Sequence, residues 1–318
     1  MECSVKVVFK PINEAATSLQ VFADKNLLKY SEMSNQWANE TKNKLSPDLL
    51  KYLQRKSIKK NLSDILELLV VFHDQPFDSF KDFTIWLNKM SIGELAKHAS
   101  LNPALLKDFL PKLEAMPSLM RIMTEWENAY FSTVDPEIIK MLAEDAREKQ
   151  KLAEKIPTRE LVEKVTGGVW LENLSEINRI YLVPQYHARP FNLYALRNNL
   201  FITHYPVETS PEAGEPSPRL LRMTSALGDS NRLKILRQLS RGESTFMEIV
   251  SFLDISKSTV HYHMAMLRAA GLIRAHVAGS ESISYSLREE ELNEVSEIIK
   301  NFIMPAKVDG SLNSSFKL

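Results

Sequence analysis

The sequence contains little of what several protein classes need. It has one cysteine, Cys3, in 318 residues, so no disulfide can form within the chain. Only nine glycines are present, and none of the glycine-rich motifs that hold nucleotide phosphates occurs. The His-Glu-x-x-His and Gly-x-Ser-x-Gly motifs of metalloproteases and serine hydrolases are also missing. We therefore expect no cofactor and no catalytic residues, and we predict that the chain is not an enzyme.

Long apolar runs are also missing. The longest apolar stretch, at residues 68–72 with Ile65 and Leu66 nearby, is far shorter than the roughly 20 residues that a membrane-spanning helix needs. The opening Met1-Glu2-Cys3 lacks the basic start of a secretory signal. These absences predict a protein of the bacterial cytoplasm with no membrane partner.

The overall charge has no excess of either sign, because 40 Lys and Arg balance 40 Asp and Glu. The local distribution is uneven. Residues 219–288 contain ten Lys and Arg against five Asp and Glu, which leaves the remainder slightly acidic. A basic segment of this size is what contact with nucleic-acid phosphates requires.

Within that segment, residues 220–287 have the pattern of a helix-turn-helix. Apolar residues recur at helical spacing on both sides of a break at 228–230, which predicts two short helices. Thr245-x-x-Glu248 is a capping box that starts a third helix, with Met247, Ile249, Val250 and Leu253 expected to point inward. A turn at 254–256 and a cap at Ser256 then begin a fourth helix at 257–270.

The fourth helix buries Val260, Met264 and Leu267 in the prediction, and this leaves short polar and aromatic side chains on its outer N-terminal face. After Gly271, alternating residues at 272–277 and 283–287 predict a β-hairpin, with its turn at 278–280. The residues predicted to contact DNA are Ser256, Lys257, Ser258, Thr259, His261, Tyr262, Arg268, Arg274 and Ser280.

Three sequence blocks in this segment resemble the winged-helix domain of ArsR-type bacterial repressors. They are LGDSNRLKIL at 227–236, Ser258-Thr259-Val260-x-x-His263, and Leu267-Arg268-x-Ala270-Gly271-Leu272-Ile273. The resemblance implies a homodimer that binds a two-fold symmetric operator in double-stranded DNA. Each protomer would place its fourth helix in a major groove, and its hairpin would be a wing along the backbone or minor groove.

A further amphipathic helix follows the wing at about 290–302. In the family that the sequence resembles, this helix packs with the first helix of the domain across the dimer axis. The resemblance therefore implies that four apolar residues contribute to dimerisation: Leu221, Leu292, Val295 and Ile299.

The sequence departs from the family in its metal ligands. Many ArsR-type proteins bind metals through Cys pairs on the helix before the turn, or through Asp and His pairs on the final helix. Neither set is present here, because Cys3 is the only cysteine and residues 290–302 contain no histidine. His261 and His263 are two residues apart, and so point about 200 degrees apart on a helix. We expect no metal site, and interpret His263 as a packing residue.

The first 205 residues predict a separate, mainly helical domain with a small β element. Helices are expected at 45–54, 62–72, 77–87, 92–99, 104–113, 119–130 and 137–156, with a capping box at Ser91-x-x-Glu94. Strands are expected at 5–9, 180–184 and 200–205, and Gly167-Gly168 is interpreted as a helix C-cap. A Pro-rich linker at 206–218 follows, then the winged-helix domain at 219–303 and a flexible tail at 304–318.

A polar effector pocket in the N-terminal domain is one expectation, and a surface hairpin with ordinary amphipathic side chains is the alternative. Arginines bind carboxylates or phosphates in a fork and tyrosines stack on rings, so the candidates are Tyr181, Tyr186, Arg189, Tyr194 and Arg197. The sequence thus predicts a dimeric repressor that a small-molecule or peptide effector, not a metal, releases from DNA. The alternative is an enzymatic or protein-docking N-terminal domain, fused to a winged helix that serves autoregulation or dimerisation.

Overall fold

The protein is described from a computed structural model, which covers residues 3–55, 58–98, 116–197, 199–278 and 281–304. The chain divides into two compact units. Unit 1 contains residues 1–208 together with 275–284, and unit 2 contains residues 209–274 together with 285–318. The predicted class is confirmed, since the chain is mainly α with small β elements. Among the described helices, none has the length and apolar character to cross a membrane.

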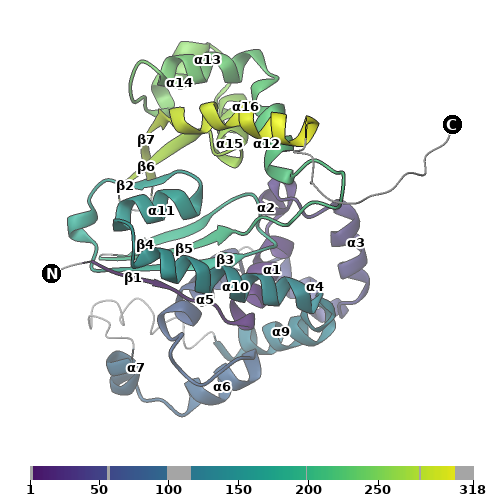
Figure 1. The fold of residues 1–318 in the computed structure, drawn as a ribbon. Coiled ribbons are helices and arrows are strands. Elements are labelled where there is room, and N and C mark those ends of the chain that lie inside the picture. The colour runs from purple at the N-terminus through teal and green to yellow at the C-terminus, as the bar shows by residue number, and fades with distance from the viewer. Residues whose placement is uncertain (1–2, 56–57, 99–115, 198, 279–280, 305–318) are drawn as a thin grey trace, which may run out of the picture. The chain divides into compact units, whose positions relative to one another are not determined.

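A four-stranded sheet forms the centre of unit 1, in the order β1-β3-β5-β4 (Figure 1). Strands β1 (Ser4–Val7), β3 (Arg179–Gln185) and β5 (Leu200–Pro206) are parallel, and β4 (Leu193–Arg197) is antiparallel to β5. The three parallel strands correspond to the strands predicted at 5–9, 180–184 and 200–205. The sequence analysis missed β4, in which a run of only four apolar residues is half-buried and shows no alternation.

Helices cover both faces of this sheet. Tyr181 and Val183 point to one face and pack with helices α1 (Pro11–Ala23) and α5 (Ile58–Val71). Ile180 and Leu182 alternate with them and pack on the opposite face, where α10 (Pro136–Ala153) and α11 (Thr158–Thr166) lie (Figure 1). Unit 1 is therefore a helix–sheet–helix arrangement.

The other elements of unit 1 are mostly helices on the α1 side. They are α2 (Lys25–Tyr30), α3 (Asn35–Asn43), α4 (Pro47–Leu53), α6 (Phe80–Asn88), α7 (Ile92–His98), α9 (Met116–Ala129), η1 (Phe131–Thr133) and η2 (Leu174–Glu176). The predicted helices at 45–54, 62–72, 77–87, 92–99, 119–130 and 137–156 correspond to α4, α5, α6, α7, α9 and α10. The predicted helix at 104–113 lies outside the described residues.

Two local predictions in unit 1 are confirmed. Ser91 and Glu94 form the expected reciprocal capping bonds at the start of α7, and Gly167 ends α11 with a positive φ of 66°. Helices α1, α2, α3 and α11 were not predicted. Helix α1 is buried on almost all of its surface, polar residues such as Asn13 and Thr17 included, so it has no exposed polar face.

A buried polar network fixes α1 against the turn after β3. Glu14, which is fully buried, accepts hydrogen bonds from the backbone amides of Tyr186 and His187 and from His187 Nδ1 at 2.5 Å. His187 Nε2 is 2.6 Å from the Tyr130 hydroxyl, which also accepts from Trp37 Nε1. Burial raises the pKa of Tyr130 well above its ordinary value. The network joins residues separated by up to 173 positions in sequence.

Unit 2 contains the predicted helical domain. Its helices are α12 (Pro218–Leu227), α13 (Ser230–Leu239), α14 (Phe246–Leu253), α15 (Lys257–Ala269) and α16 (Glu289–Ile303). Ile249, Val260 and Met264 lie in a single apolar core to which α12, α13 and α16 also contribute. The prediction for Met247 is wrong, because this side chain is 50% exposed. It precedes Ile249 by two positions, so the two side chains point in nearly opposite directions.

The predicted hairpin is present as β6 (Ile273–Ala278) and β7 (Glu281–Leu287). A third strand joins it, since β2 (Val169–Leu171) pairs in parallel with β6 in a sheet of order β2-β6-β7. Val277 is buried in the core formed by α10, α11 and the four-stranded sheet. Residues 275–284 of the hairpin therefore belong to unit 1.

Candidate nucleic-acid interface

Local hydrogen bonds hold the turn between α14 and α15. Thr245 and Glu248 form the predicted capping box at the start of α14. Asp254 ends that helix in the left-handed region, with a φ of 51°, and its amide donates to Val250. Ser256 then accepts from the amide of Thr259 and caps α15, as predicted. These contacts fix the direction in which α15 leaves the turn.

Helix α15 presents the face that the sequence predicted. Val260, Met264 and Leu267 are buried, while the polar and aromatic residues of the first two turns are exposed. The exposed residues on this face are Lys257, Ser258, Thr259, His261 and Tyr262. The Ser256 hydroxyl lies 2.9 Å from that of Ser258 and 2.8 Å from that of Thr259, so the three hydroxyls form one cluster at the helix N-terminus.

Two aromatic side chains on this face have distinct surroundings. The His261 ring stacks on Phe246 of α14, with a centroid distance of 4.0 Å and an interplanar angle of 26°. Tyr262 is 44% exposed. The sequence analysis did not find the Phe246 contact, because it connects residues on two different helices. Phe246 therefore orients the imidazole that we expect to face DNA.

The predicted phosphate-contacting cations differ in their surroundings. Lys257 is exposed and Arg268 is half-buried. Arg274 donates to the carbonyl of Leu287 and forms an ion pair with Glu290. A phosphate would therefore compete with Glu290 for this guanidinium. Ser280 lies outside the described residues.

Several other arginines of the basic segment stabilise unit 2 internally. Arg232 is buried and donates to the carbonyls of Ala226 and Ser225. Arg288 is also buried and donates to the carbonyl of Gly271. The charge count of the sequence therefore overstates the positive charge that this unit presents to a ligand.

His263 is buried, as a packing residue should be, with Nδ1 3.6 Å from Asp229 Oδ1. Asp229 caps α13 by accepting hydrogen bonds from the amides of Asn231 and Arg232. The hydrogen bond from the Arg232 amide, more than any other contact, holds the pKa of Asp229 below its ordinary value.

The predicted dimerisation residues fall into two groups. Leu221 on α12 is 54% exposed, whereas Val295 on α16 lies in the core of its own unit. Leu292 and Ile299 are half-buried and pack against the same core. Phe302, at the end of α16, is also exposed, and it was not among the predicted dimerisation residues.

The predicted effector residues do not gather around one pocket. Tyr181 packs on the α1 side of the sheet, with its ring centroid 5.2 Å from that of His73. Arg189 lies over the ring of Tyr186 and is 3.4 Å from the carboxylate of Glu32. Arg197 makes two hydrogen bonds of 3.0 Å to the carboxylate of Glu67, and Tyr194 packs against Phe201. Both arginines thus have internal carboxylate partners.

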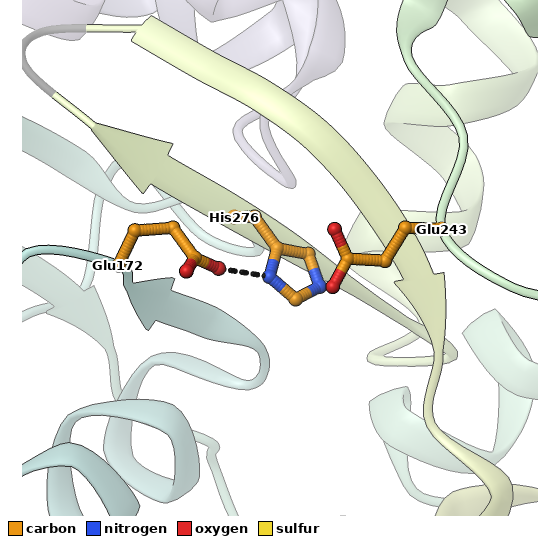
Figure 2. A group of neighbouring side chains, drawn as sticks. All are labelled: Glu172, Glu243 and His276. Carbon is orange, nitrogen blue, oxygen red and sulfur yellow. Dashed lines mark hydrogen bonds and ion pairs between the residues drawn. The ribbon is translucent and has the colours of Figure 1, made fainter.

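The sequence analysis did not predict an ion pair in unit 1 that involves the wing. His276 on β6 is buried, and its Nδ1 lies 2.5 Å from the carboxylate of Glu172, which follows β2 (Figure 2). The amide of Glu172 also donates to the carbonyl of Val277. Glu243, which Figure 2 also labels, belongs to unit 2. The side-chain pair and the backbone pairing together attach β6 to unit 1.

The helices of unit 2 and the β6–β7 hairpin constitute a winged helix-turn-helix, a class of DNA-binding domain. Residues 229–275 match the family described as "Bacterial regulatory protein, arsR family". The chain belongs to this family through its C-terminal region.

Two curated proteins of Bacillus subtilis (strain 168) are similar to the C-terminal region. The transcriptional repressor SdpR is 35% identical over 78 residues, which are 24% of this chain and 86% of that protein. The arsenical resistance operon repressor is 33% identical over 69 residues, which are 21% of this chain and 65% of that protein. A solved ArsR family transcriptional regulator is 26% identical and covers 26% of this chain and 90% of its own, with a TM-score of 0.24.

Proposed function

We propose that the protein is a dimeric transcriptional repressor of the bacterial cytoplasm, and that it binds a two-fold symmetric operator. The exposed polar face at the N-terminus of α15 is the observation that carries this proposal. In helix-turn-helix proteins this part of the recognition helix meets the base edges in the major groove. His261 and Tyr262 would contact base edges, and the hydroxyl cluster at Ser256 would meet a phosphate.

Exposed apolar side chains support the dimer. Leu221 on α12 is 54% exposed, and Phe302, Ile303 and Met304 at the end of α16 are 42%, 67% and 67% exposed. Within unit 2, α12 and α16 are neighbours. Apolar surface of this kind is stabilised when a second copy covers it. We propose that α12 and α16 form the two-fold interface.

We further propose that a non-metal effector regulates DNA binding through unit 1. The pairing of β2 with β6 supports a route for this regulation, since a change in α11 or β2 would displace the first strand of the wing. An effector that favours one arrangement by about 1 to 3 kcal/mol would suffice to regulate DNA binding. The one cysteine, Cys3, cannot supply a pair of thiolates for a metal or an arsenical.

The test is fluorescence anisotropy of the full chain on the DNA upstream of its own reading frame, against a scrambled duplex, over a salt series. We expect preferential binding to the first duplex, which is lost in His261→Ala and Tyr262→Ala. The matched pair Lys257→Ala and Lys234→Ala removes one exposed lysine from α15 or from α13. Only Lys257→Ala should lower the salt slope, by about one unit.

Equal binding to both duplexes, unchanged in His261→Ala and in Tyr262→Ala, would contradict the proposal that α15 contacts base edges. DNA release on addition of a metal ion would contradict the non-metal effector. Sedimentation of Leu221→Glu tests the interface, because a charge there should yield monomers. An unchanged dimer would rule out α12 as part of the interface.

A further inference from the structure

Unit 1 contains a cavity of about 360 Å³ between the β4 edge of the four-stranded sheet and helices α1 and α5. Its volume lies within the range of small-molecule sites. The described lining residues are Gln20, Asp24, Leu27, Ser63, Leu66, Glu67, Asn192, Leu193, Tyr194, Ala195, Ile202 and His204. Of the predicted effector residues, only Tyr194 is among them.

His204 carries the argument for a ligand. Its side chain is 3% exposed, and the alternation of β5 places it on the face of Leu200 and Ile202, toward α1 and α5. Neither ring nitrogen has a hydrogen-bond partner among the described residues. Burial lowers the pKa of His204 to about 4, so the ring is neutral at pH 7 and offers one donor and one acceptor.

One further lining residue presents a buried oxygen atom without a partner in the described structure, Gln20 Oε1, near the end of α1. The Asn192 side chain is directed to the other face of the sheet, because its Nδ2 donates to the carbonyl of Thr166 on α11 at 2.7 Å. Buried oxygens without partners are rare in folded proteins, since the lost hydration is not replaced. The cavity therefore offers acceptors in need of donors.

The charged residues of the lining indicate the sign of the ligand. Among the described lining residues, Asp24 and Glu67 are acidic and none is Lys or Arg. Arg197 binds Glu67 but is also 3.6 Å from Asp64, so one guanidinium faces two carboxylates. The cavity wall thus has a net negative charge, and it favours a cation over an anion.

We propose that this cavity binds a small organic amine, with its N–H groups on Gln20 and His204 and its carbon chain against Leu66, Leu193 and Ile202. The ammonium group would add the positive charge that the wall lacks. The role of this cavity as the effector site of a repressor rests on the proposed function. The binding of the amine to the cavity does not depend on that function.

The test uses three four-carbon probes that differ only in their end groups: putrescine, butane-1,4-diol and succinate. The melting temperature of the full chain is measured as each probe is added, and calorimetry gives the stoichiometry. We expect putrescine to raise the melting temperature saturably at one molecule per chain, butane-1,4-diol to have a smaller effect, and succinate to have none. No saturable effect of putrescine, or a larger effect of succinate, would overturn the proposal.

Substitutions at the cavity locate the binding. His204→Leu should weaken putrescine binding by about tenfold or more. Thr203→Val is the matched control, because Thr203 is also buried with an unpartnered hydroxyl but points to the opposite face of β5. It should leave binding unchanged. Gln20→Met, at a half-buried position, provides a second cavity variant if His204→Leu does not fold.

Equal putrescine binding in His204→Leu and Gln20→Met would place the site elsewhere and overturn the proposal. DNA takes no part in these measurements. A chain that binds putrescine but not its upstream DNA would therefore contradict the proposed function alone, and the reverse result would contradict only the amine site.

Discussion

The two units place their polar side chains in different ways. In unit 2 three helices begin at local caps, because Thr245, Asp229 and Ser256 each accept from amides two or three residues away. In unit 1 a buried polar network joins distant segments, as Glu14 does with His187. Local caps can be recognised in a sequence. Contacts between distant segments have no sequence signature, and we expect the loss of the buried Glu14 network to destabilise the protein more than the loss of one local cap.

Removal of the Glu14 carboxylate should have the largest effect on stability. Glu14→Ala leaves two backbone amides and the His187 imidazole without an acceptor in a dry interior. We expect the free energy of unfolding to fall by about 3 to 5 kcal/mol. All four tryptophans lie in unit 1, so denaturant unfolding followed by tryptophan fluorescence reports on this unit.

The control for that substitution is Glu40→Ala, which removes an exposed carboxylate that contacts Gln36 on the same helix. Its effect should be within about 0.5 kcal/mol. Similar small losses in both variants would mean that the buried network does not stabilise unit 1, and the contrast between the two units would disappear.

The second effect is a pH dependence from His204. Its folded pKa of about 4 is lower than the unfolded value, which is about 6.5. The unfolded chain therefore takes up the proton first, and the stability of unit 1 falls as the pH decreases from about 6.5 to 4. The loss should approach 3 kcal/mol, to order of magnitude. Unfolding of wild type and His204→Leu over this pH range should differ in slope; parallel curves would show that His204 does not titrate as a buried group.

A substitution in the turn of unit 2 should have an intermediate effect. Asp254 has a φ of 51°, a region that β-branched residues avoid. Asp254→Val should cost about 1 to 2 kcal/mol, whereas Asp254→Gly should be neutral or stabilising. Unit 2 contains no tryptophan, so its unfolding is measured by hydrogen exchange of the α14 and α15 amides. Equal protection in both variants would argue against backbone strain at this turn.

The smallest effect is expected from the cap of α14. Thr245→Ala removes the hydroxyl that accepts from the Glu248 amide, and it should cost about 1 kcal/mol. Thr245→Ser keeps the hydroxyl and should retain most of the stability. Hydrogen exchange at the start of α14 measures both. A larger loss than that caused by Glu14→Ala would reverse the order expected for local and distant contacts.

The sequence predictions were more accurate for elements that depend on local contacts than for elements that depend on distant segments. The helices of unit 2, its capping box and the hairpin were predicted because each rests on neighbouring residues. In unit 1, α1 and β4 were missed: one is buried on almost all sides, and the other is half-buried along its length. Met247 was misplaced because a hydrophobic residue type does not determine which face of a short helix it occupies.

The candidate sites show the same limits. The exposed face of α15 follows from helical spacing, so the predicted positions of His261 and Tyr262 agree with their exposure. The sequence did not predict the ion-pair partners of Arg274 and Arg197, because these carboxylates lie 16 and 130 positions away. The cavity at His204 requires β5, α1 and α5 together, and no spacing within one segment indicates it.

The sequence by itself determined that this protein has an ArsR-type winged helix and where its recognition helix begins, because caps, turns and helical periodicity act over a few residues. Only the tertiary structure decided that β2 extends the wing and that Glu14 and His187 share a buried network. It also decided that His204 lines a cavity, with no hydrogen-bond partner among the described residues. These features arise when distant segments pack together, and their free energies depend on burial, which a sequence pattern does not specify.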